Sequence, residues 1–313
     1  MTRLDVLDWL LDSDPAIRWQ VLRDLTDASR EEIQAERERV ANHGWGASLL
    51  ALQGTDGQWA GGTYWPAYDD DPDNQPWTAT TYSLLLLRDF GLNPSGREAR
   101  QAIALVRANC RWEEGNQLYF DGEVEPCING MTVALGAYFG ENMDAVVERL
   151  TREQLADGGW NCEAERGSTR SSFHTTICVL DGLLEHERST GGTGESREAR
   201  HRAEEYLLDR RLLRRESTGE LISRDWLQFS YPTRWFYDVL RGLDYFRAAG
   251  GARDERLEEA VEVLRSKEQP GGRWLLENTH PGKVHFPLED GDGQPSRWNT
   301  LRALRVLRWY EGS

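Results

Sequence analysis

Three stretches of the chain closely resemble one another, because each pairs a glutamine with a glycine-rich turn and a tryptophan. They are Gln53–Trp59, Gln154–Trp160 and Gln269–Trp274, and an apolar segment follows each of them. A pattern that recurs along a chain indicates a repeat architecture, in which each unit buries its apolar face against the next. Glycine permits the positive φ angles of such turns, and the tryptophan ring can pack between neighbouring repeats.

Six apolar segments predict buried helices. Each opens with proline or with small or polar residues, as helix N-termini do, and then carries apolar residues on a wide face. They are residues 14–25, 76–90, 126–139, 171–184, 232–246 and 295–309.

Polar stretches rich in Arg and Glu lie between the apolar segments, and their charges alternate in sign as on solvated helix faces. They are residues 3–12, 29–52, 96–108, 142–155, 196–213 and 253–268. We expect a surface loop at 186–200. Alternating helices that close on themselves form an α/α toroid. The sequence therefore predicts an all-α protein, a single α6/α6 toroid domain over residues 1–313, with a central cavity at the start of the apolar helices.

The charge of the chain limits its partners. With 53 acidic and 37 basic residues the net charge is −16, and a strong negative field disfavours nucleic acid and anionic membrane surfaces. No apolar stretch is long enough to span a bilayer, and the N-terminal residues do not resemble a signal peptide. We therefore expect a cytoplasmic protein whose four cysteines are reduced.

With their Gln…Gly…Trp turns, the repeats resemble the QW repeats of the squalene/oxidosqualene cyclase and protein prenyltransferase β-subunit superfamily. The resemblance extends over nearly the whole chain at the level of repeat and fold. It implies a terpenoid cyclase-like toroid that acts on an isoprenoid or similar apolar small molecule in its cavity. A second subunit completes the site in the protein prenyltransferases, so a second subunit or a homo-oligomer stays open here.

A sharper resemblance concerns a metal. The segment 158–183 is similar to the part of the farnesyltransferase β subunit that holds its zinc-ligand histidine, which puts His174 in that position. Glu125 and Cys127 stand where that family has an aspartate and a cysteine, and Cys162 is an alternative to Glu125. Thiolate, imidazole and carboxylate ligands suit Zn²⁺ and leave a fourth position open. We predict a zinc site built on Cys127, His174 and either Glu125 or Cys162.

An acidic cluster, Asp70, Asp71 and Asp73, precedes the second apolar helix. Crowded carboxylates raise one another's pKa, so one of them can stay protonated and act as the acid of a cyclase. The same cluster also fits a solvated loop.

Residues near the starts of several apolar helices are candidates for the cavity. Aromatic faces stabilise carbocations, and arginines can hold an anionic substrate group, although both also serve ordinary packing and ion pairing. The candidates are Trp77, Arg234, Tyr237, Arg297 and Trp298.

Two other functions are compatible with the sequence. One is a different zinc-dependent toroid enzyme with a peptide or thiol substrate, and the other is a non-catalytic binding module that keeps the toroid. The chain has no dinucleotide fingerprint, phosphate-binding loop, zincin motif or nucleophile elbow.

Overall fold

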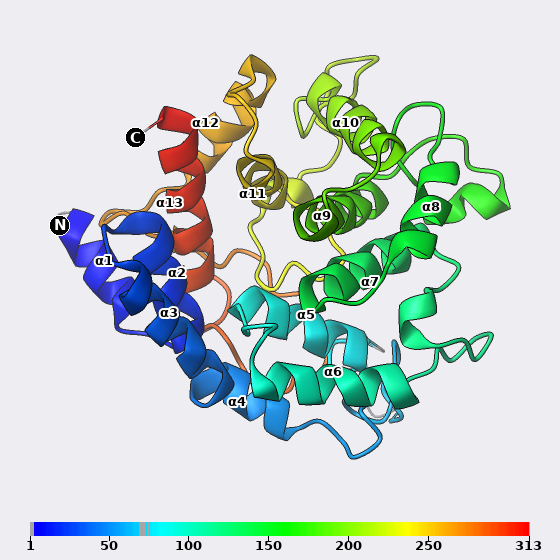
Figure 1. Ribbon diagram of the computed structural model, residues 1–313. Coiled ribbons are helices and arrows are strands. Elements are labelled where there is room, and N and C mark those ends of the chain that lie inside the picture. The colour runs from blue at the N-terminus through cyan, green and yellow to red at the C-terminus, as the bar shows by residue number, and fades with distance from the viewer. Residues whose placement is uncertain (1–2, 69–72, 74, 313) are drawn as a thin grey trace. The chain divides into compact units, whose positions relative to one another are not determined.

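The computed structural model describes residues 3–68, 73 and 75–312, and nearly all of its regular structure is helical (Figure 1). The predicted all-α fold class is confirmed. Helices of the predicted apolar segments alternate along the chain with those of the predicted polar stretches, of which one, residues 29–52, contains two helices. Within the described residues, no helix combines the length and the apolar character needed to cross a membrane.

The chain divides into two compact units. Unit 1 comprises Met1–Val40, Leu207–His280 and Phe286–Ser313, and unit 2 comprises Ala41–Tyr206 and Pro281–His285. Each unit is described by itself below. That residues 1–313 form one toroid domain around a central cavity stays a prediction.

All six predicted apolar helices are present, although their ends differ from the expected bounds by up to seven residues, at 239 instead of 232. They are α2 (Pro15–Leu25), α5 (Thr80–Phe90), α7 (Pro126–Phe139), α9 (Phe173–Thr190), α11 (Val239–Ala249) and α13 (Arg297–Glu311). The helices of the predicted polar stretches are α1 (Arg3–Leu11), α3 (Arg30–Glu38), α4 (Gly44–Ala51), α6 (Arg97–Asn109), α8 (Asp144–Arg152), α10 (Gly194–Asp209) and α12 (Glu258–Ser266), and of these α4 carries no charged residue.

Short 3₁₀ turns and one two-stranded ribbon complete the fold. The turns are η1 (Arg39–Ala41), η2 (Tyr119–Asp121), η3 (Cys162–Arg166), η4 (Asp225–Leu227) and η5 (Glu255–Leu257). In the ribbon, β1 (Trp274–Leu275) pairs antiparallel with β2 (Pro295–Ser296).

Three predicted segments differ from the structure. The stretch 29–52 is not one helix, because Gly44 has a φ of 65°, outside the helical region, where α4 begins. The helix expected from 232 begins only at Val239, where the Asp238 carboxylate caps it by accepting a hydrogen bond from the Arg241 amide at 2.7 Å. The loop expected at 186–200 is wrong, since α9 continues to Thr190 and only residues 191–193 separate it from α10.

The three glutamine–tryptophan turns build the same contacts. The indole N–H of each tryptophan donates to a carbonyl ten residues upstream, at the end of the preceding polar helix. These pairs are Trp59 to Leu49 at 2.7 Å, Trp160 to Leu150 at 2.7 Å and Trp274 to Leu264 at 2.8 Å. The backbone amide of each tryptophan donates to a threonine of the following apolar helix, which is Thr80, Thr176 or Thr300. Each turn therefore ties one polar helix to the next apolar helix.

The glutamines of the first two turns also match. The Gln53 side chain donates to the carbonyl of Ala102 at 3.0 Å, and the Gln154 side chain donates to that of Ala199 at 2.7 Å. Each glutamine thus reaches the next polar helix along the chain. Gln269 differs, because its side chain donates to the nearby Lys267 carbonyl at 3.0 Å.

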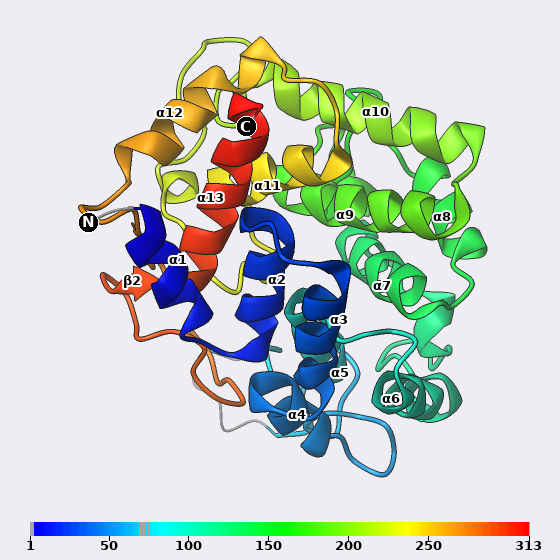
Figure 2. The ribbon, with the colours of Figure 1, turned by 60° about the vertical axis from the view of Figure 1, so that its left-hand side comes forward.

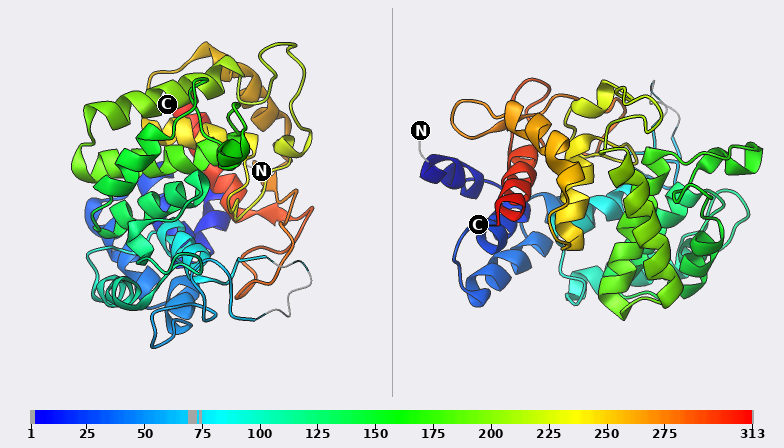
Figure 3. Two further views of the ribbon diagram at one scale, coloured as in Figure 1. Left: turned by 90° about the vertical axis from the view of Figure 1, so that its right-hand side faces the viewer. Right: turned by 90° about the horizontal axis from the view of Figure 1, so that it is seen from above.

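In unit 1, α13 packs between α2 and α11, and α1 lies against α2 (Figure 2). The view from above in Figure 3 shows α13 in red beside α11 in yellow. The apolar faces of these helices meet in a core that includes the fully buried Ile17, Leu243 and Leu301.

In unit 2, α7 and α9 approach each other unusually closely because glycines face each other across the contact. A Cβ atom added to Gly130 would lie 2.5 Å from the Cys178 carbonyl oxygen, and one added to Gly182 would lie 2.4 Å from the Gly130 carbonyl oxygen. Any larger side chain would push the backbones apart. Cys127 lies three residues before Gly130, so the two share one face of α7.

Candidate metal centre

The start of α7 positions two of the predicted ligands. Glu125 is the N-cap residue, Pro126 occupies the first helical position and Cys127 the second. The buried Asn129 side chain holds the preceding loop, because it accepts a hydrogen bond from the Glu123 amide at 2.7 Å and donates one to the Glu123 carbonyl at 2.6 Å. The sequence therefore fixes the backbone from which Glu125 and Cys127 project.

The second repeat turn positions Cys162. It begins η3, two residues after Trp160, and the Asn161 side chain caps that turn by accepting from the Glu163 amide at 2.9 Å. The Cys162 sulfur lies 3.4 Å from the Thr175 hydroxyl in the first turn of α9. The same turn that joins two repeats thus brings Cys162 to the start of α9.

Glu125, Cys127 and Cys162 form a cluster. The Cys127 and Cys162 sulfurs are 3.0 Å apart, and the Cys127 sulfur lies 3.5 Å from Oε2 of Glu125. One ligand atom from each residue lies within 4.8 Å of the others. Both cysteines are half-buried, and Glu125 is exposed.

The donor set fits a zinc ion. Tetrahedral zinc with ordinary bond lengths separates a sulfur from an oxygen by about 3.5 Å and two sulfurs by about 3.8 Å. The Cys127–Glu125 distance already has this value. To bind one ion, the two sulfurs would have to move apart by about 1 Å, which is a small adjustment for a helix end and a 3₁₀ turn.

The two thiols are unequal. The hydrogen bond with Cys127 lowers the pKa of the Cys162 thiol. The same hydrogen bond, together with burial, raises the pKa of the Cys127 thiol. Of the two thiols, Cys127 is therefore the one that retains its proton to higher pH. A metal that binds both sulfurs must displace that proton, as thiolate coordination requires.

The sequence predicts that His174 binds the same ion as Cys127. His174 is the second residue of α9, next to Thr175, and it lies outside the group of three whose ligand atoms are mutually close. The structure instead brings together Glu125 and Cys162, the two residues that the sequence treated as alternatives. The role of His174 as a zinc ligand stays a prediction.

A pair of tyrosines accompanies the cluster, and one of them, Tyr64, lies in a loop that the sequence did not single out. The hydroxyls of Tyr64 and Tyr82 are 2.9 Å apart. Burial raises the pKa of the Tyr64 hydroxyl, and its interactions with the ionisable side chains of Cys127 and Glu125 raise it further. Burial likewise raises the pKa of Tyr82. Both hydroxyls therefore keep their protons and can donate hydrogen bonds.

Trp77 is the predicted cavity residue that lies in unit 2. Its ring packs edge-on against Tyr82, with centroids 4.8 Å apart, and its indole N–H donates to the Pro281 carbonyl at 2.6 Å. Of the predicted catalytic acids, Asp73 is exposed, whereas Asp70 and Asp71 lie outside the described residues. The acid role of all three stays a prediction.

The other predicted cavity residues belong to unit 1, where the described contacts are those of packing. The Tyr237 hydroxyl donates to the Leu212 carbonyl at 2.7 Å, and Trp298 stacks on Tyr231 with centroids 4.4 Å apart. Arg297 donates to the Asp12 carbonyl at 3.1 Å and covers the Trp9 ring. Arg234 has a left-handed backbone, with a φ of 57°. A substrate role for these four residues stays a prediction.

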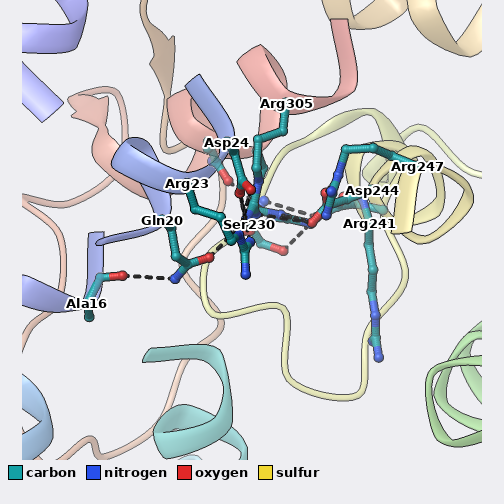
Figure 4. Close-up of polar contacts among 12 residues, drawn as sticks. Ala16, Gln20, Arg23, Asp24, Ser230, Arg241, Asp244, Arg247 and Arg305 are labelled. Atoms are coloured by element: carbon teal, nitrogen blue, oxygen red, sulfur yellow. Dashed lines mark hydrogen bonds and ion pairs between the residues drawn. The ribbon is translucent and has the colours of Figure 1, made fainter. Parts of the chain in front are cut away.

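Unit 1 also contains a buried network of charges that the sequence did not reveal (Figure 4). Arg305 donates to Gln20 at 2.8 Å and pairs with Asp24 at 3.3 Å and Asp244 at 3.5 Å. Arg302 also pairs with Asp244, at 3.7 Å. These contacts join α2, α11 and α13 across the core of the unit.

The acids of this network are held in their charged form. Burial by itself would raise the pKa of the Asp244 carboxyl, but the charges of Arg247, Arg305 and Arg302 outweigh it and hold that pKa well below its usual value. The pKa of Asp24 is lowered in the same way, since the hydrogen bonds and charge of Arg23 offset the effect of burial.

Among solved structures, the chain is similar to the apo form of the type II terpene cyclase MstE from Scytonema. The sequence identity is 16%, the TM-score is 0.45, and the match covers 94% of this chain and 85% of that chain. No family model matches the chain, and no curated protein matches it. The metal centre described above therefore stands on the contacts of this chain alone.

Proposed function

We propose that the chain is a zinc-dependent enzyme that acts on an isoprenoid or similar apolar substrate, in a prenyltransferase-like or terpene cyclase-like reaction. The observation that carries the proposal is the convergence of Glu125, Cys127 and Cys162 from two successive repeats onto one point. The substrate class rests on the resemblance of the glutamine–tryptophan turns to the QW repeats, and on the aromatic residues beside the start of α5.

The residues around the cluster would have separate roles in the reaction. Zinc bound there lowers the pKa of a coordinated thiol or water and so supplies a nucleophile at neutral pH. The exposed Glu125 marks the side from which a substrate can approach. The Tyr64 and Tyr82 hydroxyls keep their protons at neutral pH, so they can donate hydrogen bonds to a developing negative charge. The face of Trp77 or Tyr82 suits an apolar or cationic group.

Two other functions use parts of the same site. A zinc enzyme with a peptide or thiol substrate would need the same three ligands without an isoprenoid pocket. A non-catalytic binding module would need neither metal nor acid. In the cyclase version, the reaction would begin with protonation of the substrate by Asp70, Asp71 or Asp73, and it would need no zinc-activated nucleophile.

Elemental analysis of the purified full-length protein tests the metal. We expect about one zinc per chain, as in a mononuclear site. Cys127→Ser and Cys162→Ser should each remove most of it, because a hydroxyl is a far poorer zinc ligand than a thiolate. Cys110→Ala is the matched control, since Cys110 is wholly buried and outside the cluster. Zinc that persists in both serine variants would refute the site.

Two further variants define the coordination. Loss of zinc in His174→Ala but not in Glu125→Gln would give the ligand set Cys127, Cys162 and His174, and the opposite result would give the set Cys127, Cys162 and Glu125. A zinc-loaded protein incubated with farnesyl diphosphate and a small thiol should yield a thioether detectable by mass spectrometry. Turnover of the thiol substrate without the isoprenoid would favour the alternative zinc enzyme.

A further inference from the structure

Of the four cysteines, Cys127 and Cys162 have their sulfurs in contact with each other. The Cys127 and Cys162 sulfurs are 3.0 Å apart, whereas Cys110 and Cys178 are wholly buried in their helices' packing. A disulfide requires sulfurs about 2.05 Å apart, so the pair needs to close by about 1 Å. No other described contact places two sulfurs within bonding reach.

The backbone on each side can accommodate this closure. Cys162 begins the short turn η3, whose other residues are exposed or half-exposed, and Cys127 stands at the first turn of α7 rather than in its interior. Both cysteines are half-buried, so a small oxidant can reach them. Reactive thiols need both an approachable sulfur and a partner close by.

We propose that Cys127 and Cys162 are a redox-active pair that peroxide converts to an intramolecular disulfide. One thiolate attacks a peroxide oxygen, which forms a sulfenic acid and releases water after protonation. The second thiol then attacks the sulfenic sulfur, so that the S–S bond forms, the S–O bond breaks and a second water leaves. In sum, two thiols lose two electrons and two protons, and hydrogen peroxide is reduced to two waters.

The disulfide and the metal exclude each other at this site. A sulfur that has formed a disulfide no longer supplies a thiolate, so oxidation removes two of the three donors in the cluster. This consequence rests on the proposed zinc function, but the formation of the disulfide does not. The oxidation state of the pair would then decide whether the centre can hold its ion.

Thiol counting on the full-length protein tests the proposal. After removal of metal with a chelator, brief treatment with hydrogen peroxide should reduce the number of thiols that are alkylated under denaturing conditions from four to two and lower the intact mass by two hydrogen atoms. Peptide mapping should find the link between the segments that contain Cys127 and Cys162. A Cys110→Ala/Cys178→Ala variant should lose both of its thiols, and Cys127→Ala or Cys162→Ala should form no intramolecular link.

Two outcomes would overturn the proposal. One is that all four thiols survive peroxide, and the other is that a single cysteine is oxidised to a sulfinic acid without a link. Zinc loaded before the peroxide should protect both thiols, and the disulfide form should bind no zinc. If the reduced protein binds no zinc and the disulfide still forms, the enzyme proposal fails and the redox pair stands. If zinc binds and no link forms, the redox proposal fails and the enzyme proposal stands.

Discussion

At the scale of single residues, the repeat tryptophans combine two roles in one side chain. The rings of Trp59, Trp160 and Trp274 are wholly buried, and each indole N–H donates to a carbonyl at the end of the preceding helix. The carbonyls of Leu49 and Leu264 also accept from the backbone amides of Leu52 and Lys267, so the indole is their second donor. The recurrence of tryptophan in the turns therefore has a hydrogen-bonding cause as well as a packing cause.

Trp160→Phe tests this role. We expect a loss of about 2 to 4 kcal/mol in the free energy of unfolding, because the change leaves the Leu150 carbonyl unpaired and removes ring volume from the core. Trp59→Phe and Trp274→Phe should cost less, because the carbonyls of Leu49 and Leu264 keep a backbone hydrogen bond from Leu52 and Lys267. The control is Trp65→Phe, since that ring is 45% exposed and its replacement should change little. Urea denaturation measures all four, and a neutral result for Trp160→Phe would contradict the assignment.

The buried charges of unit 1 predict a dependence on pH. The pKa of Asp244 is lower in the folded protein than the value of about 3.9 in an unfolded chain. Its contribution is therefore fully present above about pH 4 and is lost as the pH falls through that value toward the folded pKa. The unfolding free energy should fall steeply below about pH 4.

Asp244→Asn should abolish part of the dependence of the unfolding free energy on pH. It should also destabilise the protein by about 3 to 5 kcal/mol at neutral pH, because Arg302 and Arg305 would keep buried charges without this counter-ion. Glu148→Gln is the comparison, since the Glu148 side chain is 71% exposed in a surface pair with Arg152. Equal acid sensitivity in the wild type and in Asp244→Asn would show that other groups control the transition.

At the scale of elements, the contact between the Cys127 and Cys162 sulfurs depends on how closely α7 and α9 pack. Gly130 and Gly182 remove the side chains that would keep these helices apart, and Cys127 is on the same face as Gly130. Cys162 is held to the first turn of α9 through Thr175. The spacing of the two helices therefore sets the spacing of the two sulfurs.

Gly130→Ala should disturb both stability and site. The added Cβ would meet backbone atoms of Cys178 and Val179 at 2.5 to 2.6 Å, which forces the helices apart and costs about 1 to 3 kcal/mol. Disulfide formation between Cys127 and Cys162 should become slower. Gly194→Ala, at the start of α10, is the control, because its Cβ would meet nothing within 4 Å. Unchanged thiol reactivity in Gly130→Ala would mean that the sulfurs are positioned independently of this helix contact.

Much of the helical order could be predicted from the sequence, because hydrophobic periodicity and caps such as Asp14 or Gly91 are local signals. The candidate metal site was only partly predictable. Cys127 and His174 stand at equivalent points of successive apolar helices, and Cys162 lies in the turn before His174, but whether their atoms meet depends on helix packing. Tyr64 carried no local signal, since its loop is held by distant Glu113, whose carboxylate accepts from the Tyr64 amide at 2.9 Å.

The charge network could not be predicted for the same reason. Arginines on an apolar helix face are visible in the sequence of α13, but their partners are not. Asp24 is 281 positions away from Arg305 along the chain, and Asp244 is 61 positions away. Only the tertiary packing of α2, α11 and α13 assigns these charges to one another.

At the scale of the whole molecule, the net charge of −16 is the dominant electrostatic fact. Surplus negative charge repels itself in the compact state more strongly than in the expanded chain. Salt screens this repulsion once the Debye length falls to about 10 Å, near 0.1 M. Raising sodium chloride from about 0.01 M to about 0.5 M should therefore increase the melting temperature measured by calorimetry. A fall in the melting temperature would mean that screened ion pairs outweigh the repulsion.

Residues 281–285 belong to unit 2 although the residues on both sides of them belong to unit 1. The indole of Trp77 holds Pro281, and the Ser83 hydroxyl lies 2.8 Å from Nε2 of His285. During translation, the body of unit 2 emerges from the ribosome long before this short piece does. Until residues 281–285 have been synthesised, Trp77 and Ser83 therefore lack these two contacts. A chain stalled on the ribosome before codon 281 would expose a surface that residues 281–285 cover in the finished protein.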